Sequence, residues 1–471
     1  MSDVRFDDVL KRTWEALSSC EPLMQSCDAI TIIRDLQGRI TVYLECTNRS
    51  SLGDTLLETV REILMSRLDV YFSGDLWVSD PRDDVFASLE DVIHSERIPL
   101  QWALRHEDHE ASGGSQPEFY VLERRVAKEY WNERVDSEST LPWPVCDVDA
   151  RKRPAVVTFY SFKGGLGRTT SLAGVSLVLA RLGFHVAMID LDLEAPGLAT
   201  LFFKDTGSQT GVVDYLIEKP LHQDDYTVRE NVLTVADPVL VAGGNPIRLL
   251  PAGSVNQNYL EKLARLDFQH QTSTQIQQTL KRLLIEISDT YRSLDFIFLD
   301  SRAGFHDLGG LAVTRMSHAV VMLGNHSRQT WAGLTSVIDT LSGHGVREPV
   351  PVVLVHAMAP GPTHPNASVE QRLFRETAYD VFQKHYYADQ GDISVPNEND
   401  PDAPFHPVVI PWHEILRGDI HLSHVSDDER RRTEALVRVL TGEPYDDLAR
   451  RLALLFGRDF PAGGGGKDHV G

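Results

Sequence analysis

A glycine-rich segment at residues 161–170 reads Ser-Phe-Lys-Gly-Gly-Leu-Gly-Arg-Thr-Thr. It stands between an apolar, β-branched run at 155–160 and an amphipathic stretch at 170–182. Glycines let successive backbone N–H groups converge on one point, and a following helix adds the partial positive charge of its N-terminus. Strand, loop and helix in this order predict an α/β fold with a phosphate site at the carboxyl edge of a parallel sheet.

The rest of residues 154–460 alternates short apolar runs with longer amphipathic stretches, which is typical of a mostly parallel sheet covered by helices on both faces. The predicted strands are 155–160, 185–190, 295–300, 319–323, 350–356 and 408–410. The predicted helices include 170–182, 273–291, 369–385, 427–440 and 446–456.

The loop does not follow the common G-x-x-x-x-G-K-[ST] pattern, because Phe162 replaces its first glycine and Arg168 its lysine. It matches the deviant Walker A pattern K-G-G-x-G-[KR]-[ST]-[ST]. In this the sequence resembles the ParA/MinD-type P-loop ATPases, and in particular the subgroup with a K-G-G-V-G-R variant loop. The resemblance covers about residues 154–425 and leaves residues 1–140 outside it.

Two further segments carry the resemblance. Residues 187–197 include Asp190 and Asp192 and are similar to the D-x-D segment at the end of the family's second strand. Residues 296–304 include Asp300 and look like a Walker B strand that runs into switch II. Carboxylates at the carboxyl ends of parallel strands lie on the same rim as the phosphate loop. Asp190 on its own would equally fit ordinary turn chemistry at a strand end.

The resemblance implies a role for each matching residue. Lys163 would be the signature lysine that reaches the nucleotide of the other subunit in an ATP-sandwich dimer. Arg168 would lie beside the β- and γ-phosphates, and Asp192 would orient or deprotonate the attacking water. Mg²⁺ would be held by Thr169, Asp190 and Asp300. The nucleotide-binding residues would be Gly164, Gly165, Leu166, Gly167, Arg168, Thr169, Thr170 and Pro411.

Three positions depart from the family's pattern or are ambiguous. The guanidinium group of arginine is planar and binds two oxygens, whereas lysine carries one compact charge. Arg168 therefore predicts tight ATP binding with slow hydrolysis. Arg302 replaces a frequent proline of switch II, and it either senses the γ-phosphate or pairs with an acidic neighbour. Pro411 resembles a position that packs on the base, whereas Trp412 beside it fits a core residue.

The chain of 471 residues is long enough for more than one domain. Residues 1–140 predict an α+β module without a catalytic motif, with a hairpin at 29–33 and 40–44 and strands at 70–78 and 98–105. We expect a linker at 141–153, the P-loop ATPase domain at 154–460, and a flexible glycine-rich tail at 461–471.

The net charge of −22 is concentrated in the first third of the chain. Residues 1–150 hold 15 of the 46 Lys and Arg residues and 30 of the 68 Asp and Glu residues. This acidity disfavours indiscriminate DNA binding by the N-terminal module and permits a basic protein partner for it. The ATPase region is also net acidic, which argues against DNA as the main ligand. Four cysteines without a C-x-x-C motif, together with the lack of a signal or membrane-span pattern, predict a cytoplasmic protein.

Three other signals are weaker. His406, His413, His421 and His424 lack the ligand spacing of a zinc site and favour surface or packing roles. The basic run 430–432 follows three acidic residues, which favours a solvated helix face over a DNA contact. The helix at 446–456 resembles the membrane-targeting helix of MinD-like proteins, but its acidic residues favour packing against the core without stable membrane insertion.

The sequence therefore predicts an ATP- and Mg²⁺-dependent molecular switch that forms a homodimer and hydrolyses ATP to ADP slowly. It would control a protein partner in bacterial signalling, defence or positioning. Two alternatives stay open, namely an ATP-stabilised interaction scaffold with negligible hydrolysis and a ParA-like DNA-partitioning ATPase.

Overall fold

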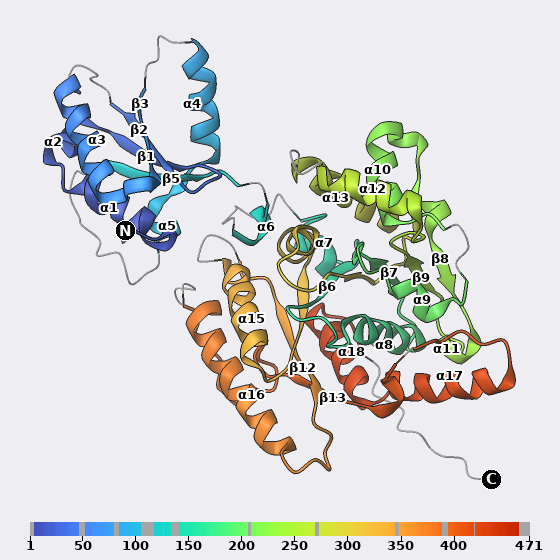
Figure 1. Ribbon diagram of the computed structural model, residues 1–471. Coiled ribbons are helices and arrows are strands. Elements are labelled where there is room, and N and C mark those ends of the chain that lie inside the picture. Colours follow the sequence, from blue (N-terminus) through green and yellow to red (C-terminus); the bar gives the residue numbers. More distant parts are fainter. Residues whose placement is uncertain are drawn as a thin grey trace. The chain divides into compact units, whose positions relative to one another are not determined.

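The computed structural model describes residues 4–46, 52–79, 84–104, 117–125, 127–132, 141–205, 209–268, 273–343, 348–388, 394–418 and 420–460. The chain forms two compact units, Met1–Ala127 and Lys128–Gly471 (Figure 1). The predicted tail at 461–471 lies outside the described residues.

The first unit is built on a five-stranded sheet of order β3-β2-β1-β5-β4. Its strands are β1 (Ala29–Arg34), β2 (Ile40–Glu45), β3 (Phe72–Val78), β4 (Ile98–Pro99) and β5 (Glu118–Glu123). Its helices are α1 (Val9–Ser18), α2 (Glu21–Ser26), α3 (Asp54–Leu68), α4 (Asp84–Glu96) and α5 (Leu100–Ala103), with 3₁₀ turns at Phe6–Asp8 and Asp69–Tyr71.

Alternating side chains of these strands face two separate cores. Ile30 and Ile32 pack with the buried residues of α1 and α3, whereas Ile33 packs with Ile93 of α4. The predicted hairpin is present as β1 and β2, which pair antiparallel. The predicted strand at 98–105 is wrong beyond Pro99, because residues 100–103 form helix α5.

The second unit contains an eight-stranded sheet of order β13-β12-β11-β6-β10-β7-β9-β8. Its strands are β6 (Ala155–Ser161), β7 (Val186–Asp190), β8 (Leu233–Val235), β9 (Ile247–Leu250), β10 (Phe296–Asp300), β11 (Ala319–Gly324), β12 (Val352–Ala359) and β13 (Val408–Pro411). All neighbouring pairs are parallel except β8 with β9.

Helices connect these strands and cover the sheet (Figure 1). The α-helices are α6 (Glu129–Asn132), α7 (Val145–Asp149), α8 (Arg168–Arg181), α9 (Leu198–Phe202), α10 (Val212–His222), α11 (Pro238–Val241), α12 (Gln257–Phe268), α13 (Ser273–Thr290), α14 (Asp307–Leu311), α15 (Arg328–Leu341), α16 (Ala367–Val381), α17 (Asp427–Leu440) and α18 (Glu443–Leu455). Short π-helical turns follow α14 at Ala312–Met316 and α16 at Phe382–Tyr386. Single 3₁₀ turns occur at Gln223–Asp225, Val228–Asn231 and Glu414–Leu416.

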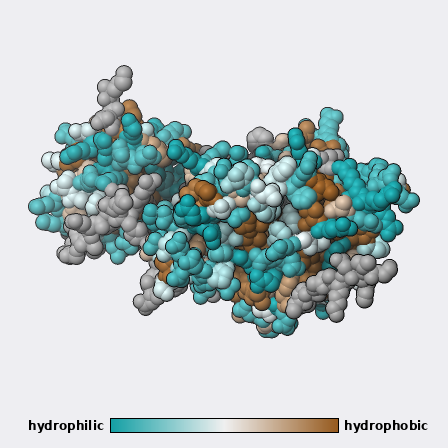
Figure 2. All heavy atoms as spheres, turned by 90° about the horizontal axis from the view of Figure 1, so that it is seen from below, coloured by the Kyte–Doolittle hydropathy of each residue, from teal (hydrophilic) through white to brown (hydrophobic). Residues whose placement is uncertain are grey.

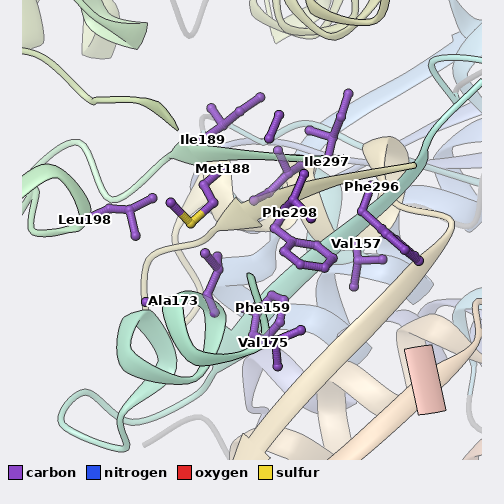
Figure 3. Close-up of a cluster of buried hydrophobic side chains, with 14 of the residues drawn as sticks. Val157, Phe159, Ala173, Val175, Met188, Ile189, Leu198, Phe296, Ile297 and Phe298 are labelled. Atoms are coloured by element: carbon purple, nitrogen blue, oxygen red, sulfur yellow. The ribbon is translucent and has the colours of Figure 1, made fainter. Parts of the chain in front are cut away.

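The two faces of this sheet bury different sets of side chains. Val321 of β11 belongs to the larger core with α8 and α18, whereas Val320 and Met322 belong to the core with α15 and α16. Figure 3 shows part of the larger core, where residues of β6, β7 and β10 meet Ala173 and Val175 of α8. The predicted fold class, a mostly parallel sheet with helices on both faces, is confirmed.

Residues at both ends of the second unit complete this core. Trp143 and Val148 lie in the segment predicted as a linker, and both are buried against the larger core. Tyr445, Leu448 and Leu452 of α18 are buried there too, and a Cβ on Gly174 of α8 would lie 2.7 Å from the Tyr445 ring. The C-terminal helix therefore packs against the phosphate-loop helix, as its apolar spacing predicts.

Among the described residues, no helix is both long enough and apolar enough to cross a lipid bilayer. On the face drawn in Figure 2, hydrophobic side chains form separate patches among hydrophilic residues.

Candidate functional site

The glycine-rich loop joins the end of β6 at Ser161 to the start of α8 at Arg168. Gly165 and Gly167 have φ angles of +79° and +74°, which residues with a side chain rarely adopt. The loop leads directly into the N-terminus of α8, whose partial positive charge favours an anion there. Lys163 at the start of the loop is exposed.

The side chain of Phe162 anchors the loop to helix α15 and to the segment after β10. Its ring lies on Gly333 of α15, where a Cβ would be 2.0 Å from the ring. The ring centroid is also 5.1 Å from that of Phe305, in the segment that follows β10. The residue that breaks the common Walker A pattern is thus an aromatic anchor, which the sequence pattern did not reveal.

The three aspartates of the candidate site meet beside this loop. Asp300 pairs with Asp190 across β10 and β7, and with Phe159 across β10 and β6. Because β6 continues into the loop two residues later, both carboxylates lie at the loop's edge of the sheet. The rim predicted from strand order is therefore present.

Arg168 is held between two of these carboxylates. Its Nε lies 2.6 Å from Oδ1 of Asp300, and its Nη2 lies 2.8 Å from Oδ2 of Asp192. Thr169 donates its hydroxyl to the other oxygen of Asp300 at 2.6 Å. The side chain of Arg168 is only 9% exposed, so this is a buried ion-pair network.

Asp190 is buried and accepts three backbone hydrogen bonds. The N–H groups of Asp192, Gly197 and Leu198 donate to its carboxylate over 3.1–3.2 Å. Burial and then the charge of Asp300 raise the pKa of Asp190 to about 8, although the N–H donors lower it. Burial likewise raises the pKa of Asp300 despite the opposing effect of Arg168. Two neighbouring buried carboxylates with raised pKa values suit a divalent cation, because the cation would stabilise the charged form of both.

The donor set at this edge fits Mg²⁺. A hydroxyl and carboxylate oxygens are the hard ligands that Mg²⁺ prefers, usually with phosphate and water completing its shell. In the described part of the chain, no group of three or more His, Cys, Asp or Glu is arranged to hold a metal ion. The Thr169 hydroxyl and the carboxylates of Asp190 and Asp300 are the oxygen donors that would hold Mg²⁺ at this edge. In addition, Oδ1 of Asp192 is buried and has no hydrogen-bond partner among the described residues.

Arg302 pairs with Glu194, as one of the two sequence hypotheses expected. Nε2 of His306 lies 2.8 Å from the other oxygen of Glu194. Glu194 and His306 were not singled out from the sequence, although Glu194 lies only two residues after Asp192. The D-x-D segment is thereby connected to the segment after β10.

Pro411 ends β13 and lines a groove of about 450 Å³ with Pro360, Glu443 and Asp446. Trp412 beside it is 51% exposed, so its interpretation as a core residue is wrong. The proposed contact of Pro411 with a base stays a prediction.

The basic run at 430–432 and two of the clustered histidines make contacts within the protein. Arg430 and Arg431 lie on the exposed face of α17 and pair with Glu434 and Asp428. Nη1 of Arg451 donates a hydrogen bond to the carbonyl oxygen of His406. Nδ1 of His421 lies 3.2 Å from the carbonyl oxygen of Thr200. These contacts agree with surface and packing roles.

Comparison with known proteins found no family model that matches this chain. Over 44 residues the sequence is 52% identical to the chloroplastic septum site-determining protein minD homolog of Arabidopsis thaliana. This match spans 9% of the chain and 14% of that relative's length.

The comparison with solved structures found matches at low sequence identity. The structure of pNOB8 ParA bound to nonspecific DNA is 16% identical, with a TM-score of 0.41, over 64% of this chain and 99% of that one. The MinD cell division protein of Aquifex aeolicus is 17% identical, with a TM-score of 0.35, over 66% and 100%. With this local match to a MinD homologue, the resemblance of this chain to the ParA/MinD-type P-loop ATPases is confirmed.

Proposed function

We propose that the chain is an ATP- and Mg²⁺-dependent molecular switch that hydrolyses ATP slowly. One observation carries the proposal. The glycine loop, Arg168, Thr169 and the carboxylates of Asp190, Asp192 and Asp300 converge at one edge of the parallel sheet.

The loop is the part that would bind the phosphates. Backbone N–H groups of residues 164–170 and the N-terminus of α8 favour negative charge at this position. The Arg168 guanidinium adds a fixed positive charge, and it would exchange one or both carboxylates for phosphate oxygens. Thr170 lies in the first turn of the same helix, beside the expected α-phosphate.

Thr169, Asp190 and Asp300 would hold Mg²⁺, which supplies charge neutralisation at the transferred phosphate. Asp192 would orient or deprotonate the attacking water through its buried Oδ1, which no described residue hydrogen-bonds. Phosphoryl transfer depends mainly on positioning and charge, so these few residues suffice for hydrolysis.

Lys163 supports nucleotide-dependent dimerisation in this proposal. Its side chain is exposed beside the phosphate loop, which leaves it accessible to a second copy of the chain. The acidic first unit would pass the nucleotide state to a basic protein partner. A ParA-like role on DNA is disfavoured by the acidity of the chain and by the acidic partners of Arg430 and Arg431.

The direct test is phosphate release by the full chain with ATP and Mg²⁺. Asp192→Asn should abolish release while ATP still binds, since the phosphate loop is intact. Asp237→Asn is the control, because Asp237 caps α11 by accepting from the Val239 N–H, which asparagine does equally well, and its other contact is with Nε2 of His424 at 3.7 Å. Release that is equal in the two variants would contradict the role of Asp192.

The position of Arg168 favours a second candidate, an ATP-stabilised scaffold without turnover. An arginine fixed by two carboxylates at 2.6 and 2.8 Å could retain the nucleotide without promoting its hydrolysis. This candidate predicts ATP binding with no phosphate release, with or without a partner. Sustained release that Asp192→Asn removes would reject it.

A further inference from the structure

The second unit begins with a short segment, residues 128–132, that we call the connector. It follows directly in the chain after the first unit and contains helix α6. Lys128 has a φ of +64°, a strained value for a residue with a side chain. Both its backbone N–H and its ammonium donate to the carboxylate of Asp307, the latter over 3.0 Å. These two hydrogen bonds stabilise the strained backbone.

Asp307 belongs to the switch II segment, which we define as residues 301–311. This segment leaves β10 after Asp300, carries Arg302 and ends with α14. One end of it thus adjoins the candidate nucleotide site, and its other end contacts the connector.

Trp131 adds further contacts between the connector and the switch II segment. Its indole Nε1 donates to the carbonyl oxygen of His306 over 2.9 Å. Its ring centroid is 5.4 Å from that of Phe305. A Cβ on Gly310 would lie 2.8 Å from the Trp131 Nε1, so α14 passes directly against the indole.

The neighbouring Tyr130 contacts α14 differently. It lines a cavity of about 50 Å³ with Leu308 and Leu311 of α14 and with residues of α10, α12 and α13. Unfilled space beside a helix removes packing contacts that would otherwise fix it. The hydrogen bonds from Lys128 and Trp131 therefore add to the core packing of Leu308 and Leu311 in fixing the position of α14.

We propose that the connector is a positioning element for switch II and that it transmits the nucleotide state toward the first unit. The proposal rests on the proposed function and names the segment through which that function is regulated. A change of partners at Asp300 or Arg302 moves the segment that Lys128 and Trp131 hold. Coupling of this kind is reciprocal, so loosening the connector alters catalysis at the site.

The test uses Trp131→Phe in the full chain, with Trp143→Phe as the matched control. Both tryptophans are buried, and each donates a 2.9 Å hydrogen bond to a backbone carbonyl, that of Pro154 for Trp143. Without nucleotide, amide exchange across residues 303–311 should rise about fivefold in Trp131→Phe and stay unchanged in the control. Asp307→Asn, which keeps an acceptor for the Lys128 N–H, should give a smaller rise.

Two further readouts concern catalysis and transmission. We expect kcat for ATP to fall several-fold in Trp131→Phe, with KM changed by less than about twofold, because positioning acts on the transition state. Amide exchange at residues 128–132 should differ between ATP with Mg²⁺ and ADP with Mg²⁺. ATP binding by the unmodified chain is measured separately by equilibrium dialysis.

Exchange across 303–311 that is equal in Trp131→Phe and Trp143→Phe would overturn the positioning role, whatever the nucleotide results. Connector exchange that is identical with ATP and ADP, in a chain that binds both, would overturn the transmission. A chain that binds no ATP would instead contradict the proposed function, and the exchange comparison without nucleotide would still decide the positioning role.

Discussion

Nε of Arg168, at the start of the phosphate-loop helix, lies 2.6 Å from Oδ1 of Asp300 at the end of β10. The contact joins the two segments that a P-loop protein uses for phosphate and for metal. Burial lowers the pKa of Arg168, but the carboxylates of Asp300 and Asp192 raise it by more, so the guanidinium stays charged. Two buried carboxylates share this cation.

Arg168→Ala should destabilise the second unit by about 3–5 kcal/mol, because it leaves the buried carboxylates of Asp192 and Asp300 without a cation. Denaturant unfolding measures this loss. Added Mg²⁺ should recover part of it by replacing the lost charge. The control Arg151→Ala removes an exposed ion pair with Asp459 and an exposed hydrogen bond to the Gly457 carbonyl oxygen, and it should cost much less. Equal losses in both variants would show that the buried network contributes little.

Gly333→Ala should weaken ATP binding at least about tenfold, because the new methyl group collides with the Phe162 ring and displaces the phosphate loop. In an unobstructed helix the same change would stabilise the protein by about 0.5–1 kcal/mol. Gly361→Ala is the control, since a Cβ there meets nothing within 4 Å. Nucleotide titration measures both affinities, and unchanged binding in Gly333→Ala would refute the anchoring role of Phe162.

His356 should make the stability of the second unit depend on pH. Burial, and then the charge of His326, lower the pKa of His356 to about 4. Its ring is fully buried and stacks on Phe374, with 4.1 Å between ring centroids. The unfolded chain binds a proton near pH 6.5 that the folded chain excludes until about pH 4, so stability falls as pH decreases across this window.

The expected loss at His356 is about 3 kcal/mol between pH 7 and pH 4. Denaturant unfolding at several pH values measures it, and His356→Leu should flatten the slope. His364→Leu, at an exposed histidine beyond the end of β12, should leave the slope unchanged. A slope that survives in His356→Leu would assign the pH dependence to other groups.

Cys27 and Cys46 should form a disulfide under mild oxidation. Their Sγ atoms are 3.0 Å apart, and the residues flank the β1–β2 hairpin. The hydrogen-bonded contact with Cys27 lowers the pKa of Cys46, which favours its thiolate as the reacting group. With hydrogen peroxide the two thiols lose two protons and two electrons, and the peroxide is reduced to water.

Peptide mapping after peroxide treatment should recover the Cys27–Cys46 pair, and dithiothreitol should reverse it. The bond closes a loop of about 20 residues, so the first unit should gain about 3 kcal/mol against unfolding. Cys20→Ser should leave the pairing intact, whereas Cys46→Ser should remove it. Pairs that form at random among the four cysteines would contradict the prediction.

The sequence predicted most of the sheet in the second unit, because its central strands are continuous apolar runs that only a twice-covered parallel sheet accommodates. It missed β8 and β9 at the sheet edge, which are only three and four residues long. It also wrongly predicted residues 100–103 as part of a strand. Helix α5 is only four residues long, so the spacing of its apolar residues does not distinguish a helix from a strand.

At the candidate site, the positions of Asp190 and Asp300 could be predicted because parallel strands bring their ends to one rim. The pairing of Arg168 with Asp192 and Asp300 could not, since side-chain partners depend on rotamers that a motif does not encode. For the same reason the sequence did not reveal Trp131 or Lys128, which lie outside every motif and meet the switch II segment only in the fold.

The decisive measurement for the proposed switch is phosphate release by the full chain under multiple turnover, with ATP and Mg²⁺. We expect slow, sustained release that requires Mg²⁺ and disappears in Asp192→Asn, with ATP binding retained. The absence of both binding and release in the unmodified chain, or release that persists in Asp192→Asn, would contradict it.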